Sequence, residues 1–524
     1  MNSVKAKSTH CTMGGPRACS HITIRFVMTR RTFFQCTGLQ AAAALQFQRL
    51  QAQTRKRNIV FILADDHRYD FIGALGHPWL KGLTPNLDRM INHGVHFANA
   101  FVTSSLCSPS RASMLTGLYM HQHGVQDNFS ALDPKLANFP QLLRIGGYRN
   151  GFFGKWHMGG EGDAPQPGFD SWLSFRGQGE YSNPELNING ERKRVQGNMT
   201  DILTAEARRF IRDNASRPFS VYLSHKAVHA PFQAPERHQK LFDGLPVPRP
   251  KTLPYKEEYY KQWPDWVRAR RASRHGVDGA IDSDEPWEVH YKRYCQCLIA
   301  IDESVGEIFA ELEAQKLLQD TLVVYMGDNG FLWGEHGLID KRAMYEASIR
   351  VPMLAHCPSL FGTAPRKVEA IALNLDIAPT FLEAAGLRPP QSMMGRSLLG
   401  PAMGNVPENW RKDFIYQYAW EQDFPYTPNI IGLRTETHSL MQYPGAWDMS
   451  ELYDIGKDPD QIHNLVADAR IGPRMRGRYV NHVKDPATKK LVEGMQDRLE
   501  QLLKETGGDP RLSGKASESD KFAL

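Results

Sequence analysis

The sequence predicts an α/β protein with a large mixed, mostly parallel sheet between helices and a smaller C-terminal α+β domain with an antiparallel sheet. Continuous β-branched and aromatic runs at 58–64, 219–225 and 321–327 have the length of strands buried on both faces, as in parallel sheets. Segments with helical apolar spacing lie between these runs. Beyond about residue 400 the apolar runs become short and closely spaced, which favours antiparallel strands.

Length and composition allow two domains behind a leader. The 524 residues are enough for a large core, and 41% hydrophobic with 23% charged residues is typical of globular proteins. We expect a leader at 1–52, a main domain at 53–405 and a C-terminal α+β subdomain at 406–524, with a frayed tail from residue 507.

The leader carries the basic excess of the chain. Residues 1–52 contain seven Lys or Arg and no Asp or Glu, so the formal charge of +6 becomes −1 without them. The rest of the chain therefore offers no electrostatic reason to expect a nucleic-acid partner. Arg30 and Arg31 precede a modestly apolar stretch at 41–45, which resembles a twin-arginine export signal cleaved near Ala52.

This signal implies the export machinery as a partner and a periplasmic or extracellular location. Met28 is an alternative start, and a disordered basic tail is the alternative interpretation of the whole segment. Polar residues interrupt the apolar stretch well short of the length that crosses a bilayer, so we expect no stable membrane span.

The main domain alternates strands with helices. Proline in a first helical turn predicts a helix opening at Thr84-Pro85, and amphipathic spacing predicts the later helices. The segment 233–290 is irregular and rich in Pro, Arg and Trp, so we interpret it as a lid or substrate-recognition loop. The other expected elements are strands at 95–101 and 148–154, and helices at 201–212 and 294–318.

The C-terminal subdomain has its own pattern. Alternating short strands and a turn at Asp458-Pro459-Asp460 predict an antiparallel sheet, followed by an amphipathic helix at 488–505. The expected strands are 430–435, 439–443 and 451–455.

We expect structural roles for the remaining cysteines, and structural roles or positions at the rim of a site for two histidines. Four cysteines lie outside the leader, which implies no disulfide framework. Cys295 and Cys297 lack a second Cys or His pair at metal spacing, so we assign them to the core. His121 and His123 are expected to be structural or to lie at the rim of a site.

Four predicted strands lead into residues that carry charge or ligand atoms. In an open α/β sheet the carboxyl ends of the strands share one crevice, so these residues are expected to form one site. Three carboxylates and an amide oxygen are hard ligands, which favour Ca²⁺ first and Mg²⁺ second over Zn²⁺. The residues are Asp65 and Asp66, Lys155 and His157, His229, and Asp328 and Asn329.

The stretch 106–117 adds a helix to this site. Ser108 is placed to cap the helix, Pro109 suits its first turn and Gly117 its end, so Cys107 should lie at a positive helix terminus where a thiol would be acidic. A cysteine phosphatase would need five residues between Cys and Arg, whereas three separate Cys107 from Arg111. The remaining alternative is a buried structural cysteine before a short helix.

The motif Cys107-x-Pro109-x-Arg111, followed by Leu115-Thr116-Gly117, resembles the signature of the type I sulfatases. These enzymes belong to the alkaline phosphatase-like superfamily. Further motifs similar to that family recur in family order from about Asn58 to about Val466. The resemblance implies that residues 53–405 form the catalytic sulfatase domain. It also implies that a formylglycine-generating enzyme oxidises Cys107 to formylglycine.

The resemblance implies a role for each residue of the site. The hydrate of the aldehyde would attack sulfur through one hydroxyl and later lose the proton of the other to expel sulfate. Arg111 would stabilise the hydrate, and His157 would take the proton of the elimination. Lys155, Lys341 and His229 would bind the sulfate oxygens, and His229 or Lys341 would protonate the departing alcohol. The Ca²⁺ ligands would be Asp65, Asp66, Asp328, Asn329 and an oxygen of modified Cys107.

Three functions follow as hypotheses. Segments 181–184, 187–190 and 224–232 look like those of sulfatases acting on sulfated sugars, in particular the N-acetylglucosamine-6-sulfatases, so a sulfated carbohydrate is the expected substrate. The first alternative is a phosphonate or phosphate ester hydrolase of the same superfamily, because both esters have nearly the same shape. The second is a catalytically silent sulfated-glycan binding protein in which Cys107 is never converted.

Overall fold

The computed structural model describes residues 56–254, 256–279, 285–446, 449–467 and 483–513. The expected leader at 1–52 and residues 514–524 of the expected tail lie outside these ranges. Residues 510–513 of that tail form a short 3₁₀ turn. None of the helices in the described part of the chain is long and apolar enough to span a bilayer.

The main sheet has ten strands in the order β13-β2-β12-β9-β1-β8-β4-β5-β6-β7. The strands β9, β1, β8, β4 and β5 are mutually parallel, whereas β12 and β2 on one side and β6 and β7 on the other pair antiparallel. The predicted mixed, mostly parallel sheet is confirmed. Its strands are β13 (Arg366–Val368), β2 (Val95–Phe97), β12 (Met353–His356), β9 (Thr321–Gly327), β1 (Asn58–Ala64), β8 (Phe219–Ser224), β4 (Arg149–Gly154), β5 (Ser171–Ser174), β6 (Glu185–Ile188) and β7 (Glu191–Arg194).

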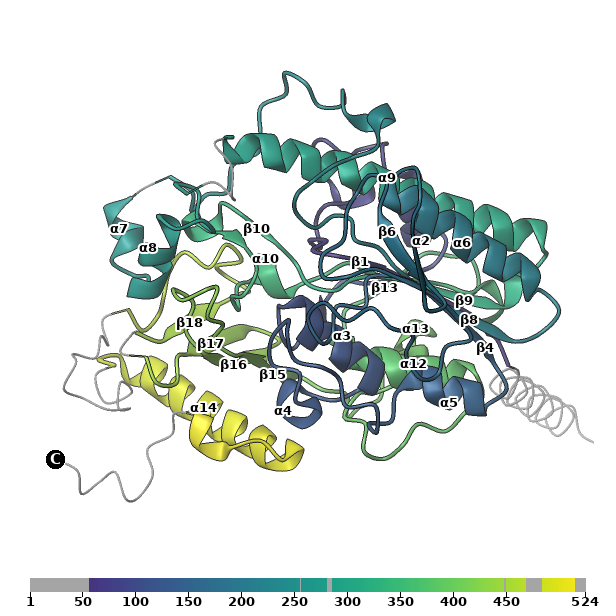
Figure 1. The fold of residues 1–524 in the computed structure, drawn as a ribbon. Helices are drawn as coiled ribbons and strands as arrows, with labels where there is room; N and C mark the ends of the chain where they lie inside the picture. The colour runs from purple at the N-terminus through teal and green to yellow at the C-terminus, as the bar shows by residue number, and fades with distance from the viewer. Residues whose placement is uncertain (1–55, 255, 280–284, 447–448, 468–482, 514–524) are drawn as a thin grey trace, which may run out of the picture. The chain divides into compact units, whose positions relative to one another are not determined.

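Helices cover both faces of this sheet (Figure 1). Along β1, Ile59, Phe61 and Leu63 pack into the core on one face, and Val60 and Ile62 pack into the core on the other. Burying each such side chain contributes roughly 1.5–3 kcal/mol. The helices on the first face are α3 (Cys107–Thr116), α5 (Phe139–Ile145) and α12 (Ile377–Ala384), and those on the second are α2 (Pro85–Asn92), α6 (Met199–Asp213) and α9 (Trp287–Ala314).

Smaller elements connect these layers. Two-stranded ribbons pair β3 with β14 and β10 with β11. These strands are β3 (Ala100–Phe101), β14 (Ala372–Leu373), β10 (Leu332–Trp333) and β11 (Ile339–Asp340). The short helices are α4 (Met120–His123), α7 (Glu257–Tyr260), α8 (Asp265–Arg271), α10 (Glu346–Ile349), α11 (Pro358–Phe361) and α13 (Leu399–Ala402). Short 3₁₀ turns occur at Gly73–Leu75, Glu236–His238, Leu318–Asp320, Glu335–Gly337, Asn374–Asp376 and Pro510–Ser513.

The C-terminal sheet has four antiparallel strands in the order β15-β16-β17-β18, packed against helix α14 (Figure 1). Three of them match the expected strands, and β15 was not predicted. The backbone N–H of Gln417 in β15 donates to the carbonyl of Thr103, so this sheet is joined directly to the main domain. The elements are β15 (Asp413–Tyr418), β16 (Ile430–Thr435), β17 (His438–Gln442), β18 (Glu451–Asp454) and α14 (Pro486–Thr506).

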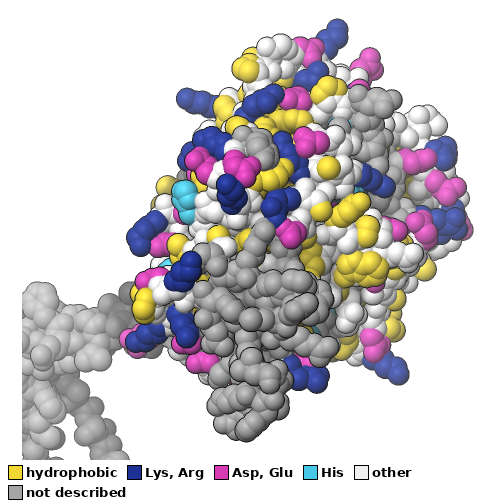
Figure 2. All heavy atoms as spheres, turned by 90° about the vertical axis from the view of Figure 1, so that its left-hand side faces the viewer, with side chains coloured by type: hydrophobic (Ala, Val, Ile, Leu, Met, Phe, Trp, Pro, Cys, Tyr) yellow, Lys and Arg dark blue, Asp and Glu magenta, His cyan; other side chains and the backbone are white. Residues whose placement is uncertain are grey.

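The segment 233–290 is more ordered than its sequence suggested. It contains α7 and α8 and the first turn of α9, and the rings of Trp263 and Trp266 are buried. These tryptophans therefore pack into the molecule. Figure 2 shows one face of the molecule, where acidic and basic side chains are interleaved over the described residues.

Candidate active site

The carboxyl ends of four adjacent parallel strands carry most of the site. Asp65 and Asp66 follow β1, Asp328 and Asn329 follow β9, Lys155 follows β4, and His229 lies in the loop after β8. Gly154, the last residue of β4, has a φ of 128°, and an added Cβ would collide with the carbonyl oxygen of Ser224 in β8. This close approach requires glycine, and it brings the chain of Lys155 against the neighbouring strand.

Cys107 is the first residue of α3 and is completely buried. The expected cap is wrong, because Leu106 occupies the N-cap position and no side chain caps the helix. The Ser108 hydroxyl instead donates to the carbonyl of His157. Gly117 ends the helix in the left-handed conformation, as expected. Ser108 thus ties the start of α3 to the chain that follows β4.

The three aspartates and Asn329 form one buried cluster. Ligand oxygens of Asp65, Asp66 and Asp328 all lie within 4.8 Å of one another. The backbone N–H of Asp66 donates to Asp328 Oδ1 at 2.9 Å, and Asn329 Nδ2 donates to Asp66 Oδ1 at 2.6 Å. Asn329 Oδ1 is buried without a hydrogen-bond partner among the described residues. Hard oxygen donors and one unpartnered amide oxygen fit a divalent cation such as Ca²⁺.

Three cationic side chains surround this cluster. Arg111 donates through Nε at 3.0 Å and Nη2 at 2.8 Å to Asp328 Oδ2, and through Nη1 at 2.7 Å to the carbonyl of Lys155. Lys155 pairs with Asp65 and Lys341 pairs with Asp66. The ammonium nitrogens of Lys341 and Lys155 lie 3.1 and 3.5 Å from Cys107 Sγ. Positive charge therefore converges on the side chain of residue 107.

Burial and neighbouring charges shift the acids differently. Burial raises the pKa of Asp66 to about 7, and the carboxylates of Asp65 and Asp328 add to this rise. Burial and the charge of Asp65 raise the pKa of Asp328. Burial opposes ionisation of Asp65 as well, but Lys155 and the other nearby cations hold its pKa well below the usual value. The cluster thus contains carboxyls that differ in proton affinity.

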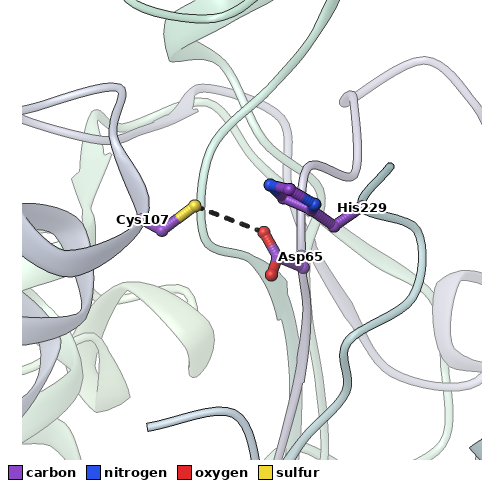
Figure 3. A group of neighbouring side chains, drawn as sticks. All are labelled: Asp65, Cys107 and His229. Carbon is purple, nitrogen blue, oxygen red and sulfur yellow. Dashed lines mark hydrogen bonds between the residues drawn. The ribbon is translucent and has the colours of Figure 1, made fainter. Parts of the chain in front are cut away.

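Cys107 does not have the acidic thiol expected at a helix terminus. Burial, with the charge of Asp65, raises its pKa to about 12, which outweighs the two ammonium groups. Its Sγ lies 3.5 Å from Asp65 Oδ1, and Figure 3 shows both side chains and His229 pointing toward one another. A protonated thiol is a poor nucleophile, so the unmodified residue does not support thiolate catalysis.

Two histidines complete the site. His229 Nδ1 bonds the carbonyl of Ala230 at 2.6 Å, and its Nε2 lies 3.9 Å from Asp66 Oδ2. His157 Nε2 lies 3.1 Å from Gln178 Nε2, with the backbone of His157 in the left-handed region. Burial, followed by the charge of Lys155, lowers the pKa of both histidines well below the usual value. Both rings are therefore neutral near pH 7.

The residues proposed from the sequence for this site lie in one cluster, apart from His157, which lies beside it and contacts Ser108, the neighbour of Cys107, and further residues join the cluster. Sequence reasoning missed Lys226, whose Nζ is 3.3 Å from the carbonyl of Ala230 and 4.7 Å above the ring of Tyr181. The Tyr181 hydroxyl donates to the carbonyl of His229 at 2.7 Å. A lysine directly after a predicted strand, at the sheet edge that carries the other site residues, is the sequence signal that could have identified Lys226.

The residues expected to be structural behave as such. Cys295 and Cys297 are free and buried in α9, and the four described cysteines form no disulfide. His123 is buried with Nε2 3.1 Å from the Ser113 hydroxyl, and His121 lies 2.6 Å from Gln417 Oε1. These histidines hold α4 against α3 and β15.

Comparisons with known proteins agree on one family. A family model described as Sulfatase matches residues 57–387, and one described as N-sulphoglucosamine sulphohydrolase, C-terminal, matches residues 334–477. The N-acetylglucosamine-6-O-sulfatase of Bacteroides thetaiotaomicron is 29% identical over 521 aligned residues, covering 88% of this chain and 91% of the relative. The multifunctional alkaline phosphatase superfamily protein PehA of Trinickia caryophylli is 26% identical, covering 79% of this chain and 92% of that protein.

A solved structure gives the same result at the level of the fold. A protein in complex with its substrate D-glucosamine-2-N,6-O-disulfate has a TM-score of 0.77 and 27% sequence identity. The match covers 87% of this chain and 99% of the solved chain. The similarity in fold therefore extends over most of both chains.

Proposed function

The chain belongs to the sulfatase family, and we propose that it hydrolyses sulfate esters on sugars with a formylglycine formed from Cys107 and a bound divalent cation. One observation carries this proposal. The first side chain of α3, two ammonium groups and a cluster of hard oxygen ligands meet at the same buried point. This arrangement suits the binding and attack of a tetrahedral oxyanion ester.

The cation would be held by the oxygen ligands of the cluster, with Ca²⁺ the first choice and Mg²⁺ the second. It would supply a Lewis acid that lowers the pKa of a hydroxyl at residue 107. The formylglycine hydrate would supply a nucleophile that is regenerated when sulfate leaves. The proposed ligands are Asp65, Asp66, Asp328, Asn329 and an oxygen of the modified Cys107.

The cationic side chains would bind and stabilise the ester. Lys155 and Lys341 would contact sulfate oxygens, and the proximity of their ammonium nitrogens to Cys107 Sγ, 3.5 and 3.1 Å, supports this role. Arg111 spans Asp328 and the carbonyl of Lys155, so it would fix the position of both while its charge stabilises the hydrate.

The histidines would move protons. The lowered pKa of His157 keeps its ring neutral near pH 7, which is the state required of the base in the elimination step. The pKa of His229 is lowered as well, so His229 would act as an acid only beside a bound anion that raises its pKa. Burial lowers the pKa of Lys341, but the charges of Asp66 and the neighbouring acidic groups together outweigh burial and raise this pKa well above its usual value. Lys341 therefore stays protonated and is the alternative proton donor.

The substrate proposal is a sugar carrying a 6-sulfate, with N-acetylglucosamine 6-sulfate as the model compound. The named Bacteroides thetaiotaomicron relative and the complex with a 6-O-sulfated glucosamine support it. The similarity to PehA keeps a phosphonate or phosphate ester hydrolase as the second candidate. The third candidate is a silent glycan-binding protein with unconverted Cys107.

Turnover of matched esters tests these candidates. Release of inorganic sulfate from N-acetylglucosamine 6-sulfate and glucosamine 2-N,6-O-disulfate is expected, with Cys107→Ala as the inactive control. Activity confined to small aryl sulfates would contradict the sugar assignment. Faster hydrolysis of a phosphodiester or phosphonate monoester would favour the second candidate, and sugar binding without any turnover would favour the third.

Two partners follow from the proposal. Formation of formylglycine requires a formylglycine-generating enzyme in the host. The segment around Arg30 and Arg31 would direct the chain to the twin-arginine export machinery, placing the enzyme in the periplasm or outside the cell. Measuring whether Arg30→Lys with Arg31→Lys retains the protein in the cytoplasm tests this location.

A further inference from the structure

Lys341 reaches the site from a tightly constrained loop. Its ammonium pairs with Asp66 and lies 3.1 Å from Cys107 Sγ. The residues on either side, Asp340 and Arg342, have φ angles of 121° and 70°. Non-glycine residues adopt such angles only where their surroundings enforce them. Some neighbouring structure must therefore hold this loop in place.

Arg270 provides one anchor from an unexpected part of the chain. It lies in α8, inside the segment 233–290 that was expected to be a lid or substrate-recognition loop, and it is 1% exposed. Its Nη2 donates to Asp340 Oδ2 and to the backbone carbonyl of Lys341, both at 2.8 Å. One guanidinium nitrogen thus joins the side chain before Lys341 to the backbone of Lys341 itself.

Arg342 provides the other anchor. Its Nη1 donates to the same Asp340 oxygen at 2.8 Å, and its Nε donates to Glu421 Oε2 at 2.6 Å. Its backbone N–H donates to the carbonyl of Ser105 at 3.1 Å, two residues before Cys107. The loop is consequently held between α8, the chain leading into α3 and the C-terminal subdomain.

We propose that Arg270 is a positioning residue for catalysis, because it holds the Lys341 backbone so that the ammonium group reaches the bound ester. In this proposal, segment 233–290 contributes to catalysis through α8, because Arg270 of that helix holds the backbone of Lys341. This inference rests on the proposed role of Lys341 in ester binding. A fixed position matters because misplacing a catalytic group by about 1 Å can cost about a hundredfold in rate.

A double-mutant cycle tests the proposal. Arg270→Lys keeps a positive charge near Asp340, but the lysine side chain is shorter and lacks the Nη2 that donates to both Asp340 Oδ2 and the Lys341 carbonyl. With p-nitrophenyl sulfate, whose good leaving group keeps weak variants measurable, kcat/KM should fall roughly tenfold to a hundredfold. In a Lys341→Ala background the same change should cost less than about twofold, because the group being positioned is gone. An equal loss in both backgrounds would overturn the proposal.

Binding of inorganic sulfate provides the same cycle without turnover. Calorimetry on the four proteins should show that Arg270→Lys weakens sulfate binding only when Lys341 is present. Arg434→Lys is the matched control, because Arg434 is also buried and pairs with Glu346 at 2.7 Å without touching the Lys341 loop. It should change the melting temperature and leave kcat/KM within about twofold.

Two further experiments cover the cases in which Arg270→Lys does not fold or the enzyme does not hydrolyse sulfate esters. If Arg270→Lys does not fold, Asp340→Asn enters the same cycle, since it removes the carboxylate that both arginines share. If the wild-type enzyme turns over phosphonates and no sulfate ester, the proposed function fails. The cycle is then measured with the phosphonate, and its coupling still decides the role of Arg270.

Discussion

The side-chain oxygen of Asn329 is the atom that most directly indicates a cation site. Asn329 Nδ2 donates to Asp66 Oδ1 and to the carbonyl of Gly330, yet the buried Oδ1 has no partner among the described residues. Leaving a buried acceptor unpaired costs about 1–3 kcal/mol unless a ligand satisfies it. A cation held by the adjacent aspartates would do so.

Asn329→Ala should therefore weaken Ca²⁺ binding about tenfold or more, as read by calorimetric titration. Asn150→Ala is the matched control, because Asn150 is also buried with an unpartnered Oδ1 but lies outside the acidic cluster. Equal Ca²⁺ affinity in wild type and Asn329→Ala would remove Asn329 from the ligand set.

The raised pKa of Asp66 predicts proton release on cation binding. Since this pKa is about 7, Asp66 is mostly protonated at pH 6 and mostly ionised at pH 8.5. A cation competes with that proton, so Ca²⁺ affinity should rise as pH increases through 7. Titrations in buffers of different ionisation enthalpy should detect about one proton released at pH 6 and almost none at pH 8.5. Asp66→Asn should lose this difference, and pH-independent binding by wild type would contradict the account.

At the scale of elements, local sequence predicted the strands well. The run from Ile59 to Ala64 is apolar throughout, as a strand buried on both faces requires, and the strand that contains it begins at Asn58 and ends at Ala64 as expected. Parallel pairing then placed Asp65 near Asp328 without any knowledge of the loops. The family motifs extended this prediction to Lys341, which no strand-end argument reaches.

The predictions that were wrong depend on contacts between segments that lie far apart in the sequence. Ser108 has the composition of a cap, but its hydroxyl is used by the carbonyl of His157, 49 positions away. The thiol of Cys107 is not acidic, because burial and Asp65 outweigh the nearby ammonium groups. The Trp-rich part of 233–290 lacked periodicity, so its short helices and buried rings could not be inferred from pattern alone.

Because Cys107 lies at the start of α3, we expect its replacement to affect activity far more than stability. Cys107→Ala should abolish turnover and shift the melting temperature by only a few degrees, because the helix has no side-chain cap to lose. Kinetics and thermal unfolding check this, with Cys357→Ala as a control that removes a different buried thiol. Loss of folding on Cys107→Ala would make the residue structural.

At the scale of the whole molecule, the C-terminal sheet shares a core with the catalytic sheet. Phe61 of β1 and Leu433 of β16 belong to the same buried cluster. The hydroxyl of Tyr345 donates to Glu451 Oε2 at 2.7 Å across the junction, and Arg434 pairs with Glu346. The expected division at residue 405 therefore crosses many buried contacts.

This shared core predicts a single cooperative unfolding transition. Differential scanning calorimetry should give a ratio of calorimetric to van't Hoff enthalpy near one for the described fold. A chain truncated after residue 405 should not fold, since it exposes the face that β15 and β16 cover. Two resolved transitions in the full chain would show that the parts at 53–405 and 406–524 are independent.

The proposed mechanism requires that residue 107 be an aldehyde when the enzyme is active. The direct measurement is the mass of the tryptic peptide containing residue 107, from protein purified from its native host. Conversion to formylglycine predicts a mass about 18 Da below that of the encoded cysteine peptide. An unconverted cysteine in protein that still hydrolyses sulfate esters would contradict the mechanism.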